Sequence, residues 1–319
     1  MTDISIVTVN YNGTGFIEDC LESISRGFAR EGDISYEAII VDNASTDSSR
    51  EYIENFCREN SSFRLIRNSA NQGFGSASNK GAEKASGEFL LFLNPDCRII
   101  DGDIGKAVDF YRKAGDAGVL GVKVMGKDGE LQLSPRAFPT LARQFYESFF
   151  CSRIFRSSPI FGSYFMTWWD HSCARQADWL SGSFMLLENR VFKEAGGFDR
   201  DYFMYSEDTA LCLELVRRGY KNYYYPYYAV EHADAGIASR DRASREAQVW
   251  QSRRTYFSKN HSAVQAAVFS LVYLAGIINR IIIFGAGSIF SKPARTRAAS
   301  YLRAVYIYYC KKRQDAGRA

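Results

Sequence analysis

The sequence is poor in the residues that build disulfide frameworks and structural zinc sites. Its 319 residues include seven cysteines, an odd number without any Cys-x-x-Cys pair, and three histidines. We therefore expect neither a disulfide scaffold nor a structural zinc site, and most cysteines should be small buried apolar residues. With 46% apolar and 24% charged residues, the chain is globular rather than disordered and can bury a large core.

The sequence also lacks an N-terminal basic and apolar leader, because a strand pattern begins already at Ile4. We expect no secretory signal and a globular body that stays in the cytoplasm. No apolar run reaches the roughly 20 residues of a spanning helix. Asn279-Arg280 divides the apolar segment 262–290, which predicts an interfacial or re-entrant pair of helices. The alternative is a helical subdomain packed on the core or on a dimer partner.

Charge is distributed unevenly, although the net charge is only +4. Residues 236–319 hold 15 Lys+Arg and 3 Asp+Glu, whereas residues 1–235 hold 25 and 33. A basic segment next to an apolar run favours an anionic membrane surface as partner, and no motif indicates nucleic acid. The same change in composition predicts two domains, 1–235 and a helical extension 236–319. A homo-oligomer is compatible with this division.

Short apolar runs alternate with helical patterns along the first hundred residues. Strands are predicted at 4–9, 38–41, 63–66 and 89–93, with helices between them. This order predicts an α/β fold with right-handed βαβ units and a mostly parallel, Rossmann-like sheet flanked by helices. Further on, we predict strands at 179–187 and 220–225, a helix at 208–218, and an irregular, lid-like segment at 130–178.

Polar side chains follow three of the predicted strands, in Asn10-Tyr11-Asn12, Asp42-Asn43 and Asn94-Pro95-Asp96. In such sheets, ligands bind beyond the carboxyl ends of the strands. Carboxylates at this edge suit a hard divalent cation that neutralises a diphosphate. Each of the three segments could instead be an ordinary turn or helix cap.

Six motifs occur in a fixed order and together resemble glycosyltransferase family 2, which has the GT-A fold. The resemblance extends from about Ile4 to His232 and is strongest to bacterial rhamnosyltransferase-like members. The motifs are Val7-Thr8-Val9-Asn10-Tyr11-Asn12, Val41-Asp42-Asn43-Ala44-Ser45-Thr46-Asp47, Asn71-Gln72-Gly73-Phe74-Gly75, Leu93-Asn94-Pro95-Asp96, Gly196-Gly197-Phe198-Asp199 and Glu207-Asp208.

The resemblance implies a binding site for a nucleotide-sugar donor and a divalent metal, Mg²⁺ or Mn²⁺. Asp96 stands where the family has the last residue of its Asp-x-Asp metal motif, and His232 stands where a histidine can complete the site. The first Asp of that motif is Asn94 here, so we expect weaker cation binding without donor. The implied donor-contacting residues are Thr8, Asn10, Tyr11, Asp42, Asn43, Asn71, Gly73, Asn79, Asn94 and Asp96.

The same resemblance implies that Asp208 is the general base, with Glu207 as the runner-up. A carboxylate in a partly apolar pocket can have a raised pKa, which suits a base. The alternative for Asp208 is N-capping of the helix that follows. Trp179 and Ser183 are expected on the acceptor side, although Trp179 fits a buried core position equally well.

The implied reaction is an inverting transfer of a sugar to a hydroxyl of a polyprenyl-linked glycan, in bacterial surface polysaccharide assembly. The expected donor is dTDP-L-rhamnose, with UDP-galactofuranose or a UDP-hexose as alternatives. The expected location is the cytoplasmic face of the plasma membrane, peripheral or monotopic. A non-catalytic partner that binds nucleotide sugars is another alternative. A nucleotidyltransferase is disfavoured because Asn10-Tyr11-Asn12-Gly13 is not a Gly-rich, Arg-containing phosphate loop.

Overall fold

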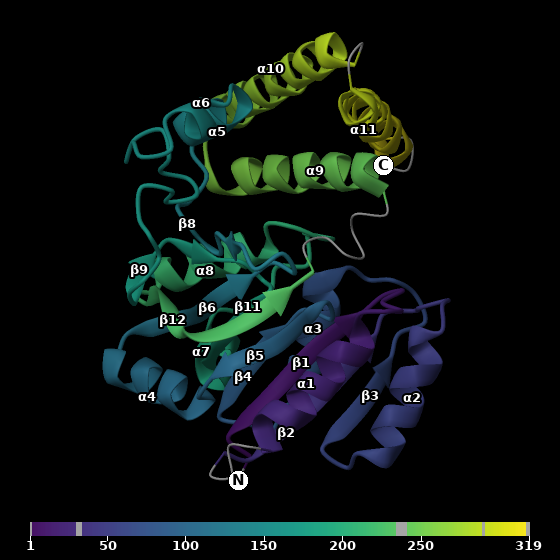
Figure 1. Ribbon diagram of the computed structural model, residues 1–319, viewed down its shortest axis with the longest axis vertical. Helices are drawn as coiled ribbons and strands as arrows, with labels where there is room; N and C mark the ends of the chain where they lie inside the picture. Colours follow the sequence, from purple (N-terminus) through teal and green to yellow (C-terminus); the bar gives the residue numbers. More distant parts are fainter. Residues whose placement is uncertain (1, 30–33, 234–240, 289–290, 317–319) are drawn as a thin grey trace. The chain divides into compact units, whose positions relative to one another are not determined.

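The computed structural model describes residues 2–29, 34–233, 241–288 and 291–316 (Figure 1). The chain forms two compact units. The first, here called the sheet unit, comprises Met1–Phe138, Asp170–Phe203 and Glu207–Ile237. The second, the helical unit, comprises Pro139–Trp169, Met204–Ser206 and Ala238–Ala319. The predicted boundary between residues 235 and 236 lies outside the described residues, and the helical unit also takes two segments from within the predicted catalytic region.

The N-terminal part of the sheet unit has the predicted alternation of strands and helices. β1 pairs in parallel with both β2 and β4, and β2 pairs in parallel with β3. These strands are largely buried, which explains why their sequences are continuous apolar runs. The elements are β1 (Ile4–Asn10), α1 (Ile17–Ala29), β2 (Tyr36–Asp42), α2 (Ser49–Glu59), β3 (Phe63–Arg67), α3 (Phe74–Ala82) and β4 (Phe89–Leu93).

The second part of the sheet is mixed rather than parallel. Along the main path the strand order is β3-β2-β1-β4-β11-β6-β12-β5 (Figure 1). β11 runs antiparallel to β4 and β6, and β5 runs antiparallel to β12, so the predicted parallel sheet is confirmed for its N-terminal half. The elements are β5 (Cys97–Gly102), α4 (Ile104–Ala114), β6 (Ala117–Met125), β11 (Phe184–Glu188), α7 (Asn189–Glu194), α8 (Glu207–Arg217) and β12 (Lys221–His232).

The segment 130–178 is more ordered than the irregular lid predicted from its composition. β7 pairs with β6, β9 pairs with β12, and β8 pairs with β10. Most of the segment, Pro139–Trp169, belongs to the helical unit. The elements here are β7 (Leu131–Gln132), β8 (Pro135–Arg136), α5 (Leu141–Ser148), α6 (Cys151–Ile154), β9 (Arg175–Ala177) and β10 (Trp179–Leu180).

The helical unit is built around α9 (Arg242–Asn260), α10 (Ala263–Gly287) and α11 (Lys292–Ala316). Its core contains an aromatic stack in which the Trp250 ring lies 3.8 Å from that of Tyr308 and 5.3 Å from that of Tyr273. The Phe257 and Phe269 rings stack at 4.2 Å. Large, well-packed aromatic rings of this kind supply much of the burial that holds three helices together.

Helix α10 continues through Asn279-Arg280, so the prediction of two separate helical pieces is wrong. The Arg280 guanidinium donates to the carbonyl oxygens of Glu147 and Ser148, which end α5, and of Gly276 one turn earlier. Its charge is therefore hydrogen-bonded inside the helical unit and does not have to interrupt the helix.

Candidate functional site

The polar segments at the strand ends come together at one edge of the sheet. Asn10 is in register with Asp42 at the carboxyl ends of β1 and β2. Leu93 at the end of β4 is in register with Phe184, which begins the antiparallel strand β11. The sheet therefore places the loop after β4 beside the segment that leads into β11.

The first two strand ends are joined by buried hydrogen bonds. The Asn10 side-chain amide donates to Asp42, Ser45 and Ser49, over 3.3, 3.0 and 2.9 Å. Asp42 is 1% exposed and also accepts from the backbone N–H of Ser45. Thr8 is fully buried inside β1. This edge of the sheet therefore has three buried polar residues, Thr8, Asn10 and Asp42. Tyr11 is 40% exposed and lies on the surface of the edge.

Asn43 organises the loop that contains Asn71 and Gly73. Its amide donates to Asn71 Oδ1 at 2.9 Å and to the Gly73 carbonyl at 3.2 Å, while its oxygen accepts from Asn68 and from the Gln72 backbone. Gly73 has a φ of +82°, and a Cβ at this position would lie 2.1 Å from the Phe203 carbonyl oxygen. Only glycine fits where this loop meets the end of the segment 170–203.

Asn94, Pro95, Asp96 and Cys97 form a tight turn after β4, closed by a 3.0 Å hydrogen bond from Cys97 N to Asn94 O. The turn was one of the alternatives left by the sequence, and it also presents a carboxylate. The backbone N–H of Asn94 donates to the Ser183 carbonyl, which fixes the turn against the start of β11.

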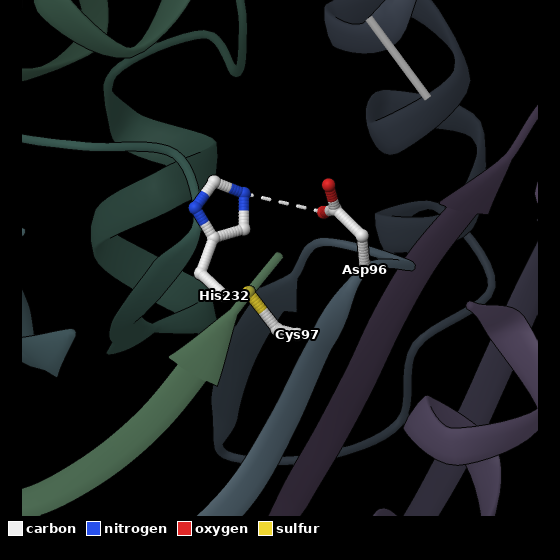
Figure 2. A group of neighbouring side chains, drawn as sticks. All are labelled: Asp96, Cys97 and His232. Atoms are coloured by element: carbon white, nitrogen blue, oxygen red, sulfur yellow. Dashed lines mark ion pairs between the residues drawn. The ribbon is translucent and has the colours of Figure 1, made fainter. Parts of the chain in front are cut away.

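Asp96 and His232 face each other across the pairing of β5 with β12 (Figure 2). Cys97 is in register with His232, so the residue before it lies beside the imidazole. His232 Nε2 is 3.2 Å from Asp96 Oδ1, and the two side chains are only 16% and 8% exposed. The antiparallel ladder thus brings together two candidate metal ligands that are far apart in the sequence.

Cys97 also lies within reach of this pair, with one potential ligand atom per residue all within 4.8 Å of one another. Burial raises the pKa of the Cys97 thiol well above its usual value, and the sulfur donates to the Ser183 carbonyl. The Cys97 thiol is therefore buried and already engaged with a backbone carbonyl, whereas the Asp96 and His232 side chains face each other. The remaining donor set of a carboxylate oxygen and an imidazole nitrogen fits a divalent cation. Two adjacent ligands about 2.1 Å from one octahedral ion would be about 3 Å apart.

The Glu207-Asp208 pair begins α8 and has two different environments. Burial, together with the neighbouring Asp208 carboxylate, raises the pKa of Glu207 well above its usual value. Burial also raises the pKa of Asp208. Several effects lower the pKa of Asp208 and partly offset its burial. Among them are hydrogen bonds from the backbone N–H groups of Gly182 and Thr209, and the positive charge of Arg136. Asp208 is thus the more readily ionised carboxylate of the two.

The segment Gly182-Ser183 connects the base candidate with the metal candidate. The Gly182 N–H donates to Asp208 Oδ2 at 3.0 Å, while the Ser183 carbonyl accepts from Asn94 N at 3.1 Å and from Cys97 Sγ. Asp208 and the turn that carries Asp96 are therefore held by two successive residues at one edge of the sheet.

Three predicted site residues have structural surroundings. Trp179 is 4% exposed, its indole N–H donates to the Ala137 carbonyl, and the Arg136 guanidinium lies 4.9 Å over its ring. The Ser183 side chain is buried, and its backbone carbonyl accepts from the turn after β4. Asn79 uses its amide oxygen and nitrogen on the Phe198 backbone, at 2.8 and 2.7 Å. Trp179 and Asn79 thus use their polar side-chain atoms on the surrounding backbone, and the proposed ligand contacts of all three residues remain predictions.

Two residues at this edge were not singled out from the sequence. Arg136 acts on the charge of Asp208, and Gln132 contacts His232 through both polar atoms of its amide. Both lie on two-residue strands within the segment predicted to be irregular. No local pattern marks them, because their partners are more than 70 residues away in the sequence.

Comparisons with known proteins identify the family and the fold of this chain. The sequence model of glycosyl transferase family 2 matches residues 5–171. An N-acetylglucosaminyl-diphospho-decaprenol L-rhamnosyltransferase of Mycobacterium tuberculosis is 30% identical over 274 residues, covering 82% of this chain and 86% of that protein. The rhamnosyltransferase WbbL of Escherichia coli K12 is 27% identical, covering 72% and 83%.

Among solved structures, the mannosyltransferase PcManGT from Pyrobaculum calidifontis, in complex with GDP-Man and Mn²⁺, superposes with a TM-score of 0.56 at 16% identity. The superposition covers 97% of this chain and 87% of that one, which supports the predicted GT-A fold. Since the family's sequence model spans over half of the chain and the mycobacterial relative aligns along most of both proteins, this chain is a glycosyltransferase of family 2, similar to the bacterial rhamnosyltransferases.

Proposed function

We propose that the protein transfers a sugar, with inversion, from a nucleotide-sugar donor to a hydroxyl of a lipid-linked glycan. The main support for the proposal is the Gly182-Ser183 segment. Gly182 donates to Asp208, and the next residue, Ser183, accepts from the turn that contains Asp96. A base and a metal ligand at one edge of the sheet are what a single in-line displacement requires.

Asp208 removes the proton from the acceptor hydroxyl, and the oxygen then attacks the anomeric carbon opposite the leaving nucleotide diphosphate. The raised pKa of Asp208 favours this step, because a stronger base accepts the proton more readily. The Gly182 N–H holds one carboxylate oxygen, which orients the side chain. Glu207, whose pKa is raised further, remains protonated and supports the wall of the site.

Asp96 and His232 would hold the divalent cation, which stabilises the negative charge of the departing diphosphate. A carboxylate oxygen paired with an imidazole nitrogen favours Mn²⁺ over Mg²⁺, since Mg²⁺ prefers oxygen ligands more strongly. The solved mannosyltransferase with the same fold contains Mn²⁺. Asn94 stands in place of a carboxylate of the family motif, so a bound cation would have one ionised protein ligand fewer.

The proposed donor is dTDP-L-rhamnose, because both rhamnosyltransferases named above align along most of their length. The nucleoside would lie against Tyr11 and the loop of Asn71 and Gly73, which Asn43 holds in place. UDP-galactofuranose and UDP-hexoses are the alternatives that a donor screen separates. Asp42 and Asn10 would support this surface from beneath.

The proposed acceptor is a polyprenyl-diphosphate-linked glycan at the cytoplasmic face of the plasma membrane. The mycobacterial relative is named for such a substrate. Helix α10 is long and apolar enough to cross a membrane, and only 22% of its most apolar window is buried within the protein. We propose that it lies along the surface instead, because Arg280 is tied to the end of α5 and anchors one face of the helix inside the protein.

The opposite face of α10 is an exposed apolar stripe, formed by Val264, Val268, Leu271, Ile278 and Ile282. Their spacing of three, four or seven residues places them in one row along the helix. The buried residues Phe269, Tyr273 and Ile277 face the other way. On the neighbouring helix α11, the Arg297 guanidinium lies 5.5 Å over the ring of Phe284 in α10. An exposed apolar row in a C-terminal segment rich in Lys and Arg suits the interface of an anionic membrane.

The decisive experiment measures release of nucleotide diphosphate from a panel of donors with Mn²⁺ or Mg²⁺, for the native protein and for Asp208→Asn. We expect dTDP-L-rhamnose to be turned over with a lipid-linked acceptor. In Asp208→Asn, turnover should fall by about 10²- to 10⁴-fold while donor binding survives. Full turnover in this variant would refute the assignment of the base, and donor binding without turnover in the native protein would favour a non-catalytic partner.

A further inference from the structure

Gln132 makes a two-point contact with His232. Its side-chain nitrogen donates to the His232 carbonyl oxygen at 3.0 Å, and its side-chain oxygen lies 2.9 Å from His232 Nδ1. Gln132 ends the short strand β7, which pairs with β6, while His232 ends β12. The contact thus comes from a strand next to the candidate metal site and involves none of its ligand atoms.

These two contacts determine which imidazole nitrogen carries a hydrogen. A backbone carbonyl can only accept, so the nitrogen of the Gln132 amide must face it. The amide oxygen then faces Nδ1, and because this oxygen can only accept, Nδ1 must carry a hydrogen. In a neutral imidazole with hydrogen on Nδ1, the free lone pair is on Nε2.

That lone pair faces another acceptor. Nε2 lies 3.2 Å from Asp96 Oδ1 (Figure 2), and the two side chains are only 16% and 8% exposed. Two electron-rich atoms at this distance repel each other unless a proton or a cation lies between them. The arrangement is thus suited to a shared positive charge.

We propose that Gln132 is a positioning residue, which holds His232 in the Nδ1–H tautomer so that Nε2 is presented to a divalent cation shared with Asp96. The inference rests on the proposed metal site but makes a separate claim about the protein without metal. Hydrogen bonds to the second nitrogen of a ligating histidine fix its tautomer and its orientation.

A purely structural role for Gln132, tying β7 to β12, makes a different prediction. Two variants separate the alternatives. Gln132→Leu removes both contacts with His232. Gln132→Glu keeps an acceptor for Nδ1–H but loses the donor to the carbonyl oxygen. If the tautomer matters, Glu should rescue what Leu loses; if only the tie between strands matters, Glu should be as harmful as Leu.

The first measurement is the ¹H–¹⁵N correlation spectrum of the imidazoles in the full-length protein without metal, at about pH 8.5, well above the usual histidine pKa. The chain has only three histidines, so His232→Ala identifies the signal. We expect Nδ1 to carry a hydrogen in the native protein and in Gln132→Glu, whereas Gln132→Leu should shift the imidazole toward the form with hydrogen on Nε2 alone, which donates to Asp96. Gln176→Leu, an exposed change on β9, is the matched control and should leave the spectrum unchanged.

The second measurement is binding of Mn²⁺ alone, followed by the electron paramagnetic resonance signal of the free ion. Loss of the contact should weaken binding by about 10- to 100-fold in Gln132→Leu, with little change in Gln132→Glu. An unchanged tautomer in Gln132→Leu would overturn the proposal. If the tautomer shifts in Gln132→Leu but neither the native protein nor any variant binds Mn²⁺, the role of Gln132 is supported and the proposed metal site is rejected.

Discussion

At the scale of single residues, two neighbouring carboxyl groups are given different chemistry by their surroundings. Glu207 is buried and is affected by the charge of Asp208, whereas Asp208 accepts hydrogen bonds from the backbone N–H groups of Gly182 and Thr209. The hydrogen bonds favour ionisation of Asp208 and partly offset its burial. Glu207 is thereby the harder of the two carboxyl groups to ionise, beside one that can take up a proton.

The pH dependence of the reaction follows from the raised pKa of Asp208. Only the ionised carboxylate can accept a proton, so kcat/KM should fall as the pH decreases through this pKa, and the fall should begin above the range of an ordinary aspartate. Glu207→Gln should change kcat/KM little, because it replaces a protonated carboxyl by an amide of similar shape. A profile with an acidic limb at the usual aspartate pKa, or a collapse of rate in Glu207→Gln, would contradict the division of roles.

Gly73 provides a second test at this scale. Gly73→Ala places a methyl group against the Phe203 carbonyl oxygen, so the loop that we propose contacts the donor must move. Gly129→Ala is a matched control, since Gly129 has a φ of +79° and open space around its Cβ position. Denaturant unfolding should show a loss of about 1 kcal/mol for the control, from backbone strain alone. The free energy of unfolding of Gly73→Ala should fall by about 1–3 kcal/mol more than that of the control. The KM for donor should also rise in Gly73→Ala. Equal losses of stability in the two variants would show that the close approach to Phe203 is not important.

At the scale of elements, the scaffold of the site depends on contacts between segments distant in the sequence. Asn79 in α3 holds the loop at Phe198 by two buried hydrogen bonds. That loop follows the residues Gly196-Gly197, both with φ above +70°, and leads to the segment before α8. Helix α3, which follows the loop of Asn71 and Gly73, is thereby connected to the region that leads to Asp208.

Removing this connection should be costly. Asn79→Ala leaves the N–H and carbonyl of Phe198 without these partners in a buried place, which should lower the free energy of unfolding by about 2–4 kcal/mol. The exposed residue Asn55 on α2 offers a control, for which Asn55→Ala should change stability by no more than about 0.5 kcal/mol. Chemical denaturation of both variants measures the difference, and a similar small loss in each would show that the two bonds are not important.

The sequence predicted those elements whose signals are local. β4 was predicted with its observed limits, because Phe89–Leu93 is a continuous apolar run that ends at a Pro-containing turn. β12 was predicted too short, since Pro226 marked its end, whereas the strand continues through a register shift between Tyr225 and Ala229. The contact of Asp96 with His232 was expected only from family resemblance. The contact of Gln132 with the same histidine was not expected, because it spans 100 residues and depends on the pairing of β7, β6 and β12.

At the scale of the whole molecule, charge and apolar surface are concentrated in the helical unit. Its C-terminal part carries most of the excess of basic residues, and α10 exposes an apolar row along one face. Exposed apolar residues arranged in a continuous row are unusual on a soluble surface and indicate a partner. The continuity of α10 through Arg280 also explains why the row remains straight where the sequence suggested a break.

Membrane binding can be tested on the full-length protein with Leu271→Asp/Ile282→Asp, two changes at well-exposed residues of the stripe. Burial of each side chain in the interface contributes about 1.5–3 kcal/mol, so the double variant should bind vesicles at least about 100-fold more weakly. Gln251→Asp adds charge at an exposed position on α9 and should have a much smaller effect.

Co-sedimentation should further show tighter binding to vesicles with anionic lipid than to zwitterionic ones, and added salt should reduce this preference. Because neither substitution lies in the sheet unit, transfer to a water-soluble acceptor analogue should persist in the double variant. Undiminished vesicle binding by that variant would mean that another surface holds the enzyme at the lipid.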